Sequence, residues 1–298
     1  MKYIIFGAGG FLGKELVNYL QSENQEVIAV QKKDLLYSVD ITNAESFESL
    51  KHIEKVDIII NSVSILPNAA LSNDAFYLKN LFETNTIGAV NILHFAAAQK
   101  IKKIINCSTL AIINKPWPVP LKETDVNYPG GVHTGYAVSK LSQELLMNEI
   151  SKQLSIELLH LRLSALYGVN MKWSGILPVL IEKLSNNEKV FLADAEKNSF
   201  DFLFTDDLVK IIKRLSDLEK WSYNTVNTAS AEEIFLKKIA DEIVAQTTSI
   251  SEITYSETDS PASRSVINID RLREMLNNDF YFTPLAEGIK KIIADRKN

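Results

Sequence analysis

The sequence predicts an α/β fold: a doubly wound, mostly parallel sheet followed by a smaller α+β part near the C-terminal end. Two observations predict it. Short apolar runs alternate with amphipathic helical stretches through the first two-thirds of the 298 residues. The run from Val56 to Asn61 is almost continuously apolar, as in strands buried on both faces of a parallel sheet. After about residue 165 the alternation changes, so we expect a separate, smaller part there.

The first predicted element is a strand that leads directly into a glycine-rich turn. The strand covers residues 2–6, three glycines follow with the spacing G-x-x-G-x-x-G, and a helical pattern begins at Lys14. Such a turn lets the backbone approach a diphosphate, and the helix after it directs its first amides at the anion. Its place between a strand and a helix favours a dinucleotide site over a chance glycine cluster. The residues expected at the cofactor are Gly7, Gly10, Phe11, Leu12 and Gly13.

The turn after the second predicted strand, 26–30, bears on the choice of cofactor. A dinucleotide fold usually places an acidic residue here to bind the adenosine ribose, whereas this chain has Lys32 and Lys33. These lysines would attract a 2′-phosphate, which favours NADP(H), with NAD(H) as the alternative. A solvated turn is the other interpretation of either lysine. Further along, Asp40 could reach the adenine edge or could simply form part of a turn before a helix at 44–53.

Polar residues follow two of the later strands at the edge where doubly wound sheets bind ligands. Ser62 and Ser64 come after the strand at 56–61, and we expect them at the cofactor and the substrate, respectively. Thr109 follows the strand at 103–108. The Pro- and Gly-rich stretch 114–131 is long enough to predict a functional loop. The remaining helices are expected at 73–99, 134–152, 175–184, 206–215, 231–245, 270–275 and 284–294, and the remaining strands at 156–163, 190–191, 199–204 and 223–226.

Composition excludes several classes of function. The net charge of −5 and the pI near 5.5 argue against a nucleic-acid-binding surface. No apolar run is long enough for a membrane span, and the chain starts with a core strand rather than a signal peptide. The single cysteine, Cys107, forms no internal disulfide, which favours the cytoplasm. The four histidines are scattered, so we expect no metal site.

Three side chains together predict carbonyl–alcohol chemistry. Tyr136 and Lys140 are four residues apart on one predicted helix and therefore share a face. We expect the ammonium to lower the pKa of the phenol towards the range of a general acid or base. Thr109 could hydrogen-bond a substrate carbonyl or alcohol. With a hydride cofactor on the glycine turn, these three residues are the candidate catalytic set.

At this point the chain resembles the extended short-chain dehydrogenase/reductases of the NAD-dependent epimerase/dehydratase family, over nearly its whole length. The matching pieces are Gly7-x-x-Gly10-x-x-Gly13, Asp40-Ile41, Asp57 to Asn61, Asn85-Thr86-x-Gly88-x-x-Asn91, Ser108-Thr109, Tyr136-x-x-x-Lys140, Leu161-Arg162-x-x-x-x-Tyr167-Gly168 and Asp206-Asp207-Leu208.

The resemblance implies a Rossmann-type NAD(P)-binding domain over 1–165, to which 200–228 returns. It also implies a substrate-binding part made of 166–199 and 229–298. Tyr136 would be the acid/base, and Lys140 would bind the nicotinamide ribose. Asp40, Ile41 and Asn85 would lie at the cofactor. The family further implies a homodimer through the helices at 73–99 and 134–152.

Two departures concern the substrate, which in this family is commonly a nucleotide sugar. The position where such members carry a diphosphate-binding Arg is Phe200 here, and a position that is commonly Asn is Ala165. A charge-assisted donor to a phosphate is costly to lose. Arg264 could supply the missing charge, or it could be a solvent-facing loop residue. We expect all three positions to lie at the substrate. The missing acidic residue after the second strand and the Asp40-Ile41 pair also resemble the deoxysugar 4-ketoreductase branch.

The leading hypothesis is an NAD(P)-dependent reductase of a nucleotide-activated 4-keto sugar. A 4-epimerase with tightly bound NAD would use the same residues. A reductase of a non-nucleotide carbonyl compound would fit the departures at Ala165 and Phe200. A cofactor-binding sensor or scaffold is the non-enzymatic alternative, and the presence of Thr109, Tyr136 and Lys140 argues against it.

Overall fold

The computed structural model describes residues 1–33, 36–171 and 175–296. The chain forms two compact units, each made of segments that are distant in sequence. The first is Met1–Asn114, Val126–Arg162 and Val209–Val226, and the second is Lys115–Asp125, Leu163–Leu208 and Asn227–Asn298. The Pro- and Gly-rich stretch is therefore divided between the two units. The substrate-binding role expected for 166–199 and 229–298 stays a prediction.

A seven-stranded parallel sheet with the strand order β11-β6-β5-β4-β1-β2-β3 is built around β1. β1 pairs in parallel with β2 on one side and with β4 on the other. The strand order therefore reverses at β1, which is the point where doubly wound sheets bind their ligands. The predicted fold class is confirmed. The strands are β1 (Lys2–Phe6), β2 (Glu26–Gln31), β3 (Tyr37–Ser38), β4 (Ile58–Asn61), β5 (Lys103–Thr109), β6 (Glu157–Leu163) and β11 (Thr225–Thr228).

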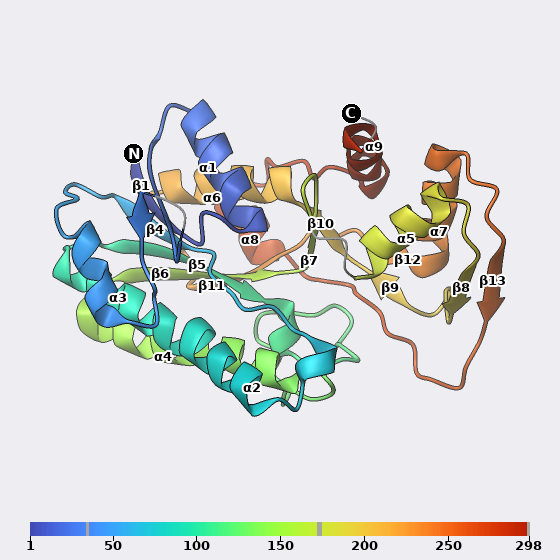
Figure 1. Ribbon diagram of the computed structural model, residues 1–298, viewed down its shortest axis with the longest axis horizontal. Helices are drawn as coiled ribbons and strands as arrows, with labels where there is room; N and C mark the ends of the chain where they lie inside the picture. The colour runs from blue at the N-terminus through green and yellow to red at the C-terminus, as the bar shows by residue number, and fades with distance from the viewer. Residues whose placement is uncertain (34–35, 172–174, 297–298) are drawn as a thin grey trace. The chain divides into compact units, whose positions relative to one another are not determined.

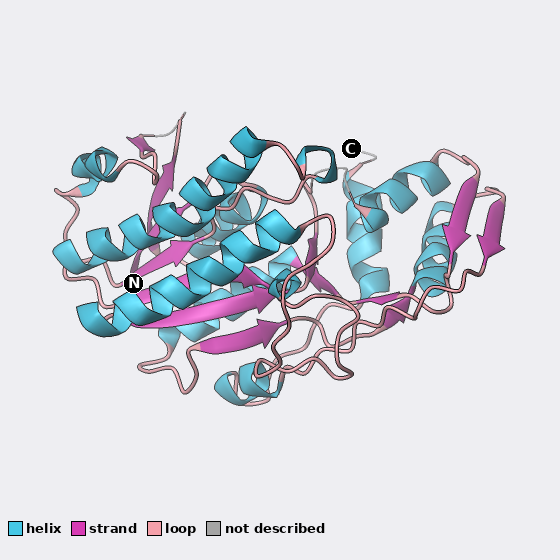
Figure 2. Cartoon of the chain, turned by 90° about the horizontal axis from the view of Figure 1, so that it is seen from below, coloured by secondary structure: helices cyan, strands magenta, loops and turns pink. Residues whose placement is uncertain are grey.

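Helices cover both faces of this sheet. In Figure 1, α1 (Phe11–Ser22) and α6 (Thr205–Asp217) lie on one face, and α3 (Gly88–Ala98) and α4 (Thr134–Leu154) lie on the other. Figure 2 shows the two long helical stretches of the second face running side by side across the strands. Between the sheet and this face, the rings of Phe6, Phe47 and Phe95 form an aromatic cluster with centroids 5.3–6.2 Å apart.

The long helix expected over about 73–99 is present from Ala75 to Ala98, but it contains a π-helical turn that was not predicted. α2 (Ala75–Leu81) passes into a π-helical turn, Phe82–Ile87, before α3 begins. Within the turn, Asn85 is fully buried, and its side chain accepts a hydrogen bond from Ile65 N and donates one to Ile65 O. Asn is a poor helix former, and π-bulges often occur at functional sites. The irregular turn thus lets one amide side chain fix the loop after β4.

Smaller differences concern helix boundaries. α1 begins at Phe11, three residues before the expected start. The helix expected at 44–53 is a 3₁₀ helix, Ala44–Leu50, and its first turn is capped by the Asn43 side chain, which accepts from Glu45 N at 3.0 Å. Two further 3₁₀ turns cover Ala69–Leu71 and Leu110–Ile112. The interior elements were thus predicted better than their ends.

The second unit has the expected α+β character. Its strands form three two-stranded pairs: β7 (Ala165–Tyr167) with β10 (Phe202–Phe204), β9 (Ser199–Phe200) with β12 (Ile234–Phe235), and β8 (Val190–Ala193) with β13 (Ile253–Ser256). No strand was predicted at β13, and β12 falls inside the helix predicted at 231–245, which begins only at Leu236. Gly288 of α9 allows a close approach, because a Cβ there would lie 2.2 Å from the hydroxyl of Tyr167. The helices of this unit are α5 (Ile176–Ser185), α7 (Leu236–Thr247), α8 (Asp270–Met275) and α9 (Leu285–Asp295).

Two other kinds of site are absent from the described residues. No helix among them combines the length and apolar character needed to cross a bilayer. Nor do three or more His, Cys, Asp or Glu side chains in the described ranges gather as a metal ligand set. Burial raises the pKa of the Cys107 thiol to about 12, so this cysteine is a protonated core side chain at neutral pH.

Candidate active site

The glycine turn after β1 has the geometry that a diphosphate requires. Gly7 has φ = +87°, a conformation that favours glycine, and its carbonyl oxygen accepts from Gly10 N at 2.9 Å. A Cβ at Gly13 would lie 2.0 Å from that same oxygen. These glycines let the helix pack closely against the end of the strand. α1 begins at Phe11, and its N-cap residue, Gly10, has no side chain to cap the first amides. The turn therefore fits a dinucleotide whose diphosphate rests on the first amides of α1.

Ser62 lies beside this turn at the carboxyl end of β4. Its N and its Oγ both donate to the carbonyl oxygen of Phe6, at 3.0 and 2.8 Å. A Cβ on Gly7 would come within 2.8 Å of Ser62 Oγ. The structure thus brings Ser62 to the predicted cofactor edge, where its hydroxyl ties the ends of β1 and β4 together.

The two residues expected near the adenosine bind each other. Lys32 Nζ lies 2.8 Å from Asp40 Oδ2. Burial acts to raise the pKa of Asp40, but hydrogen bonds from Lys32 and Thr42 keep that pKa below its usual value. Ile41 is buried beneath them, and its carbonyl oxygen accepts from Asn91 Nδ2 at 2.8 Å. The positive charge of Lys32 is therefore partly neutralised, which weakens the basis for favouring NADP(H).

Tyr136 lies in the first turn of α4 and is only 8% exposed. Burial raises its pKa above the usual value, and hydrogen bonds with Thr109 and Ser64 act in the opposite direction without cancelling that rise. Three residues predicted at the substrate are thus brought together from α4, the end of β5 and the loop after β4. The expectation of a lowered tyrosine pKa was wrong, and the phenol is protonated at neutral pH.

Lys140, one turn further along α4, is 1% exposed and has its own partners. Its Nζ donates to Cys107 O at 2.8 Å and to Gln143 Oε1 at 2.5 Å. Burial lowers the pKa of Lys140 to about 8. Gln143 Oε1 also accepts from Asn106 Nδ2 at 3.0 Å, and Gln143 Nε2 donates to the carbonyl oxygen of Asn85. Gln143 therefore links the lysine to β5 and to the π-helical turn.

The same polar network continues to a buried ion pair. Glu144 accepts from Arg162 Nη2 at 2.8 Å and from the hydroxyl of Ser108. Burial acts to raise the pKa of Glu144, but its hydrogen bonds with Arg162 and Ser108 hold it below its usual value. Burial also lowers the pKa of His160 to about 4, so this histidine is neutral at physiological pH. Buried, hydrogen-bonded side chains thus hold the region beneath Tyr136 and Lys140 in place.

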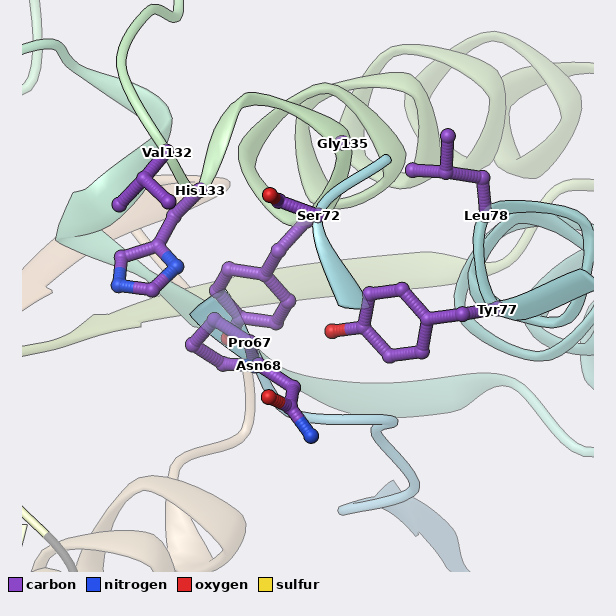
Figure 3. A pocket seen from close by; sticks show the side chains of 9 residues that line it. Pro67, Asn68, Ser72, Tyr77, Leu78, Val132, His133 and Gly135 are labelled. Carbon is purple, nitrogen blue, oxygen red and sulfur yellow. The ribbon is translucent and has the colours of Figure 1, made fainter. Parts of the chain in front are cut away.

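A pocket in the first unit has Tyr136 in its wall. In Figure 3 the rings of His133 and Tyr77 lie on opposite sides of this pocket, with Pro67 between them in the view. The hydroxyl of Tyr77 donates to Leu66 O at 2.8 Å. The lining residues are Pro67, Asn68, Ser72, Tyr77, Leu78, Val132, His133, Gly135 and Tyr136. The space that this pocket encloses is only about the size of one water molecule, so it marks a shallow hollow beside the phenol rather than a formed substrate cavity.

The other three residues predicted at the substrate belong to the second unit. Ala165 begins β7, and Phe200 ends β9 with its ring stacked on Phe202, the centroids 5.6 Å apart. Arg264 donates through Nε and Nη2 to the two carboxylate oxygens of Glu233, at 2.9 and 2.6 Å. Arg264 is therefore engaged by a carboxylate of the chain itself, and the substrate role of all three residues stays a prediction.

Comparison with known proteins assigns this arrangement to a family. The NAD dependent epimerase/dehydratase family matches residues 3–229. The chain belongs to that family. The match includes the glycine turn, Thr109, Tyr136 and Lys140, so the resemblance inferred from the residues is confirmed, and the chain is an NAD(P)-dependent enzyme of the extended short-chain dehydrogenase/reductase type.

Several relatives within this family are similar over most of the chain. A putative UDP-glucose 4-epimerase from Methanocaldococcus jannaschii is 23% identical over 312 aligned residues, covering 99% of this chain and 98% of that protein. A dTDP-4-dehydro-6-deoxyglucose reductase from Escherichia coli is 23% identical over 264 residues and 80% of each chain. The structure of RMD from Pseudomonas aeruginosa complexed with NADPH has the same fold, with a TM-score of 0.83 at 18% identity over 99% of this chain and 98% of that one.

Some residues of the candidate active site were not predicted from the sequence. Gln143 and Asn106 carried no motif, although Gln143 is three residues after Lys140 and so faces the same side of α4. Tyr77 and His133 line the pocket from α2 and from the residue before α4. His133 carried a similar signal, since it precedes Tyr136 by three residues at the start of a helix.

Proposed function

We propose that this enzyme reduces the 4-keto group of a nucleotide-linked sugar, with Tyr136 as the general acid. The observation that carries the proposal is the state of Tyr136: a buried phenol with a raised pKa, hydrogen-bonded to Thr109 and Ser64 in the wall of a pocket. A reductase must start with a protonated acid, and this phenol is one at neutral pH. The name of the E. coli relative, a reductase of a dTDP-linked keto sugar, supports the substrate class.

The side chains divide the work as follows. A bound nicotinamide supplies the hydride to the carbonyl carbon. Thr109 Oγ1 accepts from Ala111 N at 3.1 Å, and its hydroxyl, which hydrogen-bonds with Tyr136, would donate its proton to the carbonyl oxygen once substrate is bound. As charge develops on that oxygen, Tyr136 donates its proton to it. Lys140 uses two of its three ammonium protons on Cys107 and Gln143, so one remains for a ribose hydroxyl of the cofactor.

A 4-epimerase is the second candidate, and the name of the M. jannaschii relative favours it. An epimerase would first remove a proton from a sugar hydroxyl, which needs Tyr136 as phenolate. Burial works against that form. We therefore rank the reductase first. Reduction of a non-nucleotide carbonyl compound and a non-catalytic cofactor-binding role rank below both.

The proposal is tested by incubating the purified protein with NADPH or NADH and the UDP- or dTDP-linked 4-keto-6-deoxyglucose. We expect loss of reduced cofactor only when the keto sugar is present, and a product that carries two more hydrogens by mass spectrometry. Tightly bound NAD, with interconversion of 4-epimers and no net oxidation of added cofactor, would establish the epimerase instead.

We propose NADP(H) as the preferred cofactor, with NAD(H) as the alternative. Lys32 is exposed at the end of β2, where a 2′-phosphate would need a cation. Asp40 would have to share Lys32 with that phosphate. The cytoplasmic location also stays a prediction.

We further propose a homodimer through α2 and α4. Exposed apolar side chains gather on these packed elements, among them Phe76 on α2, Ile87 in the π-helical turn and Leu145 on α4, which is 62% exposed. Such a face is often covered by the same face of a second copy. Sedimentation should give a dimer for the wild type and a monomer for Leu145→Glu. A monomeric wild type at micromolar concentration contradicts this arrangement.

A further inference from the structure

Lys115 is a cation of the second unit with no carboxylate partner in the described part of the chain. Its Nζ donates to Ser265 Oγ at 3.1 Å, and it lies 4.4 Å from the ring centroid of Trp117 and 5.8 Å from that of Phe200. These neighbours desolvate the ammonium and lower the pKa of Lys115, while the side chain as a whole keeps contact with solvent. The chain thus presents a partly desolvated positive charge beside two aromatic rings.

The nearby Arg264 is in a different electrostatic state. Both carboxylate oxygens of Glu233 bind its guanidinium, and Glu233 is itself fixed by a hydrogen bond from Ser199 Oγ at 2.6 Å. An anion could bind Arg264 only by displacing this carboxylate. Lys115 needs no such displacement, since within the described residues its hydrogen-bond partner is the neutral hydroxyl of Ser265.

Two backbone connections fix the segment that carries Lys115. Leu121 N donates to Val266 O at 2.8 Å, and Asn268 N donates to Leu121 O at 2.9 Å, so residues 115–125 are tied to the segment that carries Ser265. Ser265 Oγ donates its own proton to Ser199 O at 2.9 Å and can therefore only accept from Lys115. Of the three ammonium protons, two remain for a ligand.

We propose that Lys115 binds a phosphate oxygen of a nucleoside diphosphate, beside the rings of Trp117 and Phe200. The proposal rests on the proposed function in one respect: it assigns this group to the nucleotide part of the substrate. A lysine ammonium is a common phosphate ligand. The alternative role of Lys115 is to hold residues 115–125 in place through the aromatic rings.

The test is calorimetric titration of the full chain, saturated with NADP⁺, with UDP, dTDP and the nucleosides uridine and thymidine. Saturation with the dinucleotide keeps the probes out of the glycine-turn site. Lys115→Met removes the charge and retains the apolar stem, and Lys115→Arg keeps the charge. Lys122→Met, an exposed lysine of the same segment, is the matched control.

We expect Lys115→Met to weaken diphosphate binding by about tenfold or more, with the nucleosides bound as in the wild type. Lys115→Arg should restore most of the affinity, and Lys122→Met should bind like the wild type. Equal diphosphate affinity in Lys115→Met and the wild type overturns the inference and leaves the proposed function standing. A loss of diphosphate and nucleoside binding together, with a lower melting temperature, assigns Lys115 the structural role instead. A wild type that binds none of the probes contradicts the nucleotide-linked substrate and this inference with it.

Discussion

The surroundings of Tyr136 and those of Lys115 are built from different kinds of structure. Tyr136 and Lys140 are four residues apart on one helix and so share a face, and Thr109 reaches Tyr136 from the end of β5. Lys115 and Ser265 are 150 residues apart and meet through backbone pairing of two irregular segments. The difference teaches that the reacting groups of this chain are set by regular elements, whereas the charges that would meet a substrate are set by loops.

The largest expected effect comes from removing the phenol of Tyr136. Tyr136→Phe should lower kcat by about 10²–10⁴-fold, because the general acid is lost while the shape of the site is kept. Steady-state kinetics with the keto sugar, together with cofactor titration, would measure this. Tyr281→Phe, which alters a fully exposed phenol of the second unit, is the control and should be silent. Equal kcat in Tyr136→Phe and Tyr281→Phe would show that Tyr136 is not the general acid.

The sequence predicted the sheet and its helices because strand and helix periods differ and the glycine turn occurs in a recognisable context. It could not predict the π-helical turn, since nothing in Phe82–Ile87 distinguishes it from a helix until Asn85 meets Ile65. It also missed the sign of the Tyr136 pKa shift. The four-residue spacing places Lys140 on the same face as Tyr136. The burial of Tyr136 and the binding of the Lys140 ammonium by Cys107 and Gln143 depend on tertiary packing.

Gln143 tests whether the network beneath the reacting residues stabilises the first unit. Gln143→Leu leaves Lys140 and Asn106 each without one partner, so we expect a loss of about 1–3 kcal/mol in the free energy of unfolding by urea at neutral pH. Gln153→Leu changes an exposed glutamine of the same helix and should stay within about 0.5 kcal/mol of the wild type. A similar, small loss in both variants would show that the network contributes little.

The Lys32–Asp40 pair tests cofactor choice with a smaller expected effect. Lys32→Met should lower the NADPH-to-NADH ratio of kcat/KM by about tenfold, because a charged donor to the 2′-phosphate is lost. Asp40→Asn should raise the same ratio, since Lys32 is then released from its carboxylate. Ratios unchanged in both variants would mean that neither residue senses the 2′-phosphate.

The binding partner of Arg264 could not be predicted from the sequence. Arg264 had the charge that a phosphate needs, but Glu233, 31 residues earlier, binds it on both oxygens. No spacing rule connects a residue of one loop to a carboxylate near the start of β12. Lys115 was not predicted as a binding residue, because its role depends on neighbours such as Ser265 that are distant in sequence.

The most direct test of the central claim is the pH dependence of the hydride-transfer step in a single turnover with NADPH and the keto sugar. General-acid catalysis by Tyr136 requires the protonated phenol. Burial raises the pKa of Tyr136, so the protonated form persists to higher pH. The rate should therefore stay level through neutral pH and fall only on the alkaline side, above the ordinary tyrosine pKa of about 10. A rate that instead rises with pH through the neutral range would show that the phenolate is the active form and would contradict Tyr136 as the general acid.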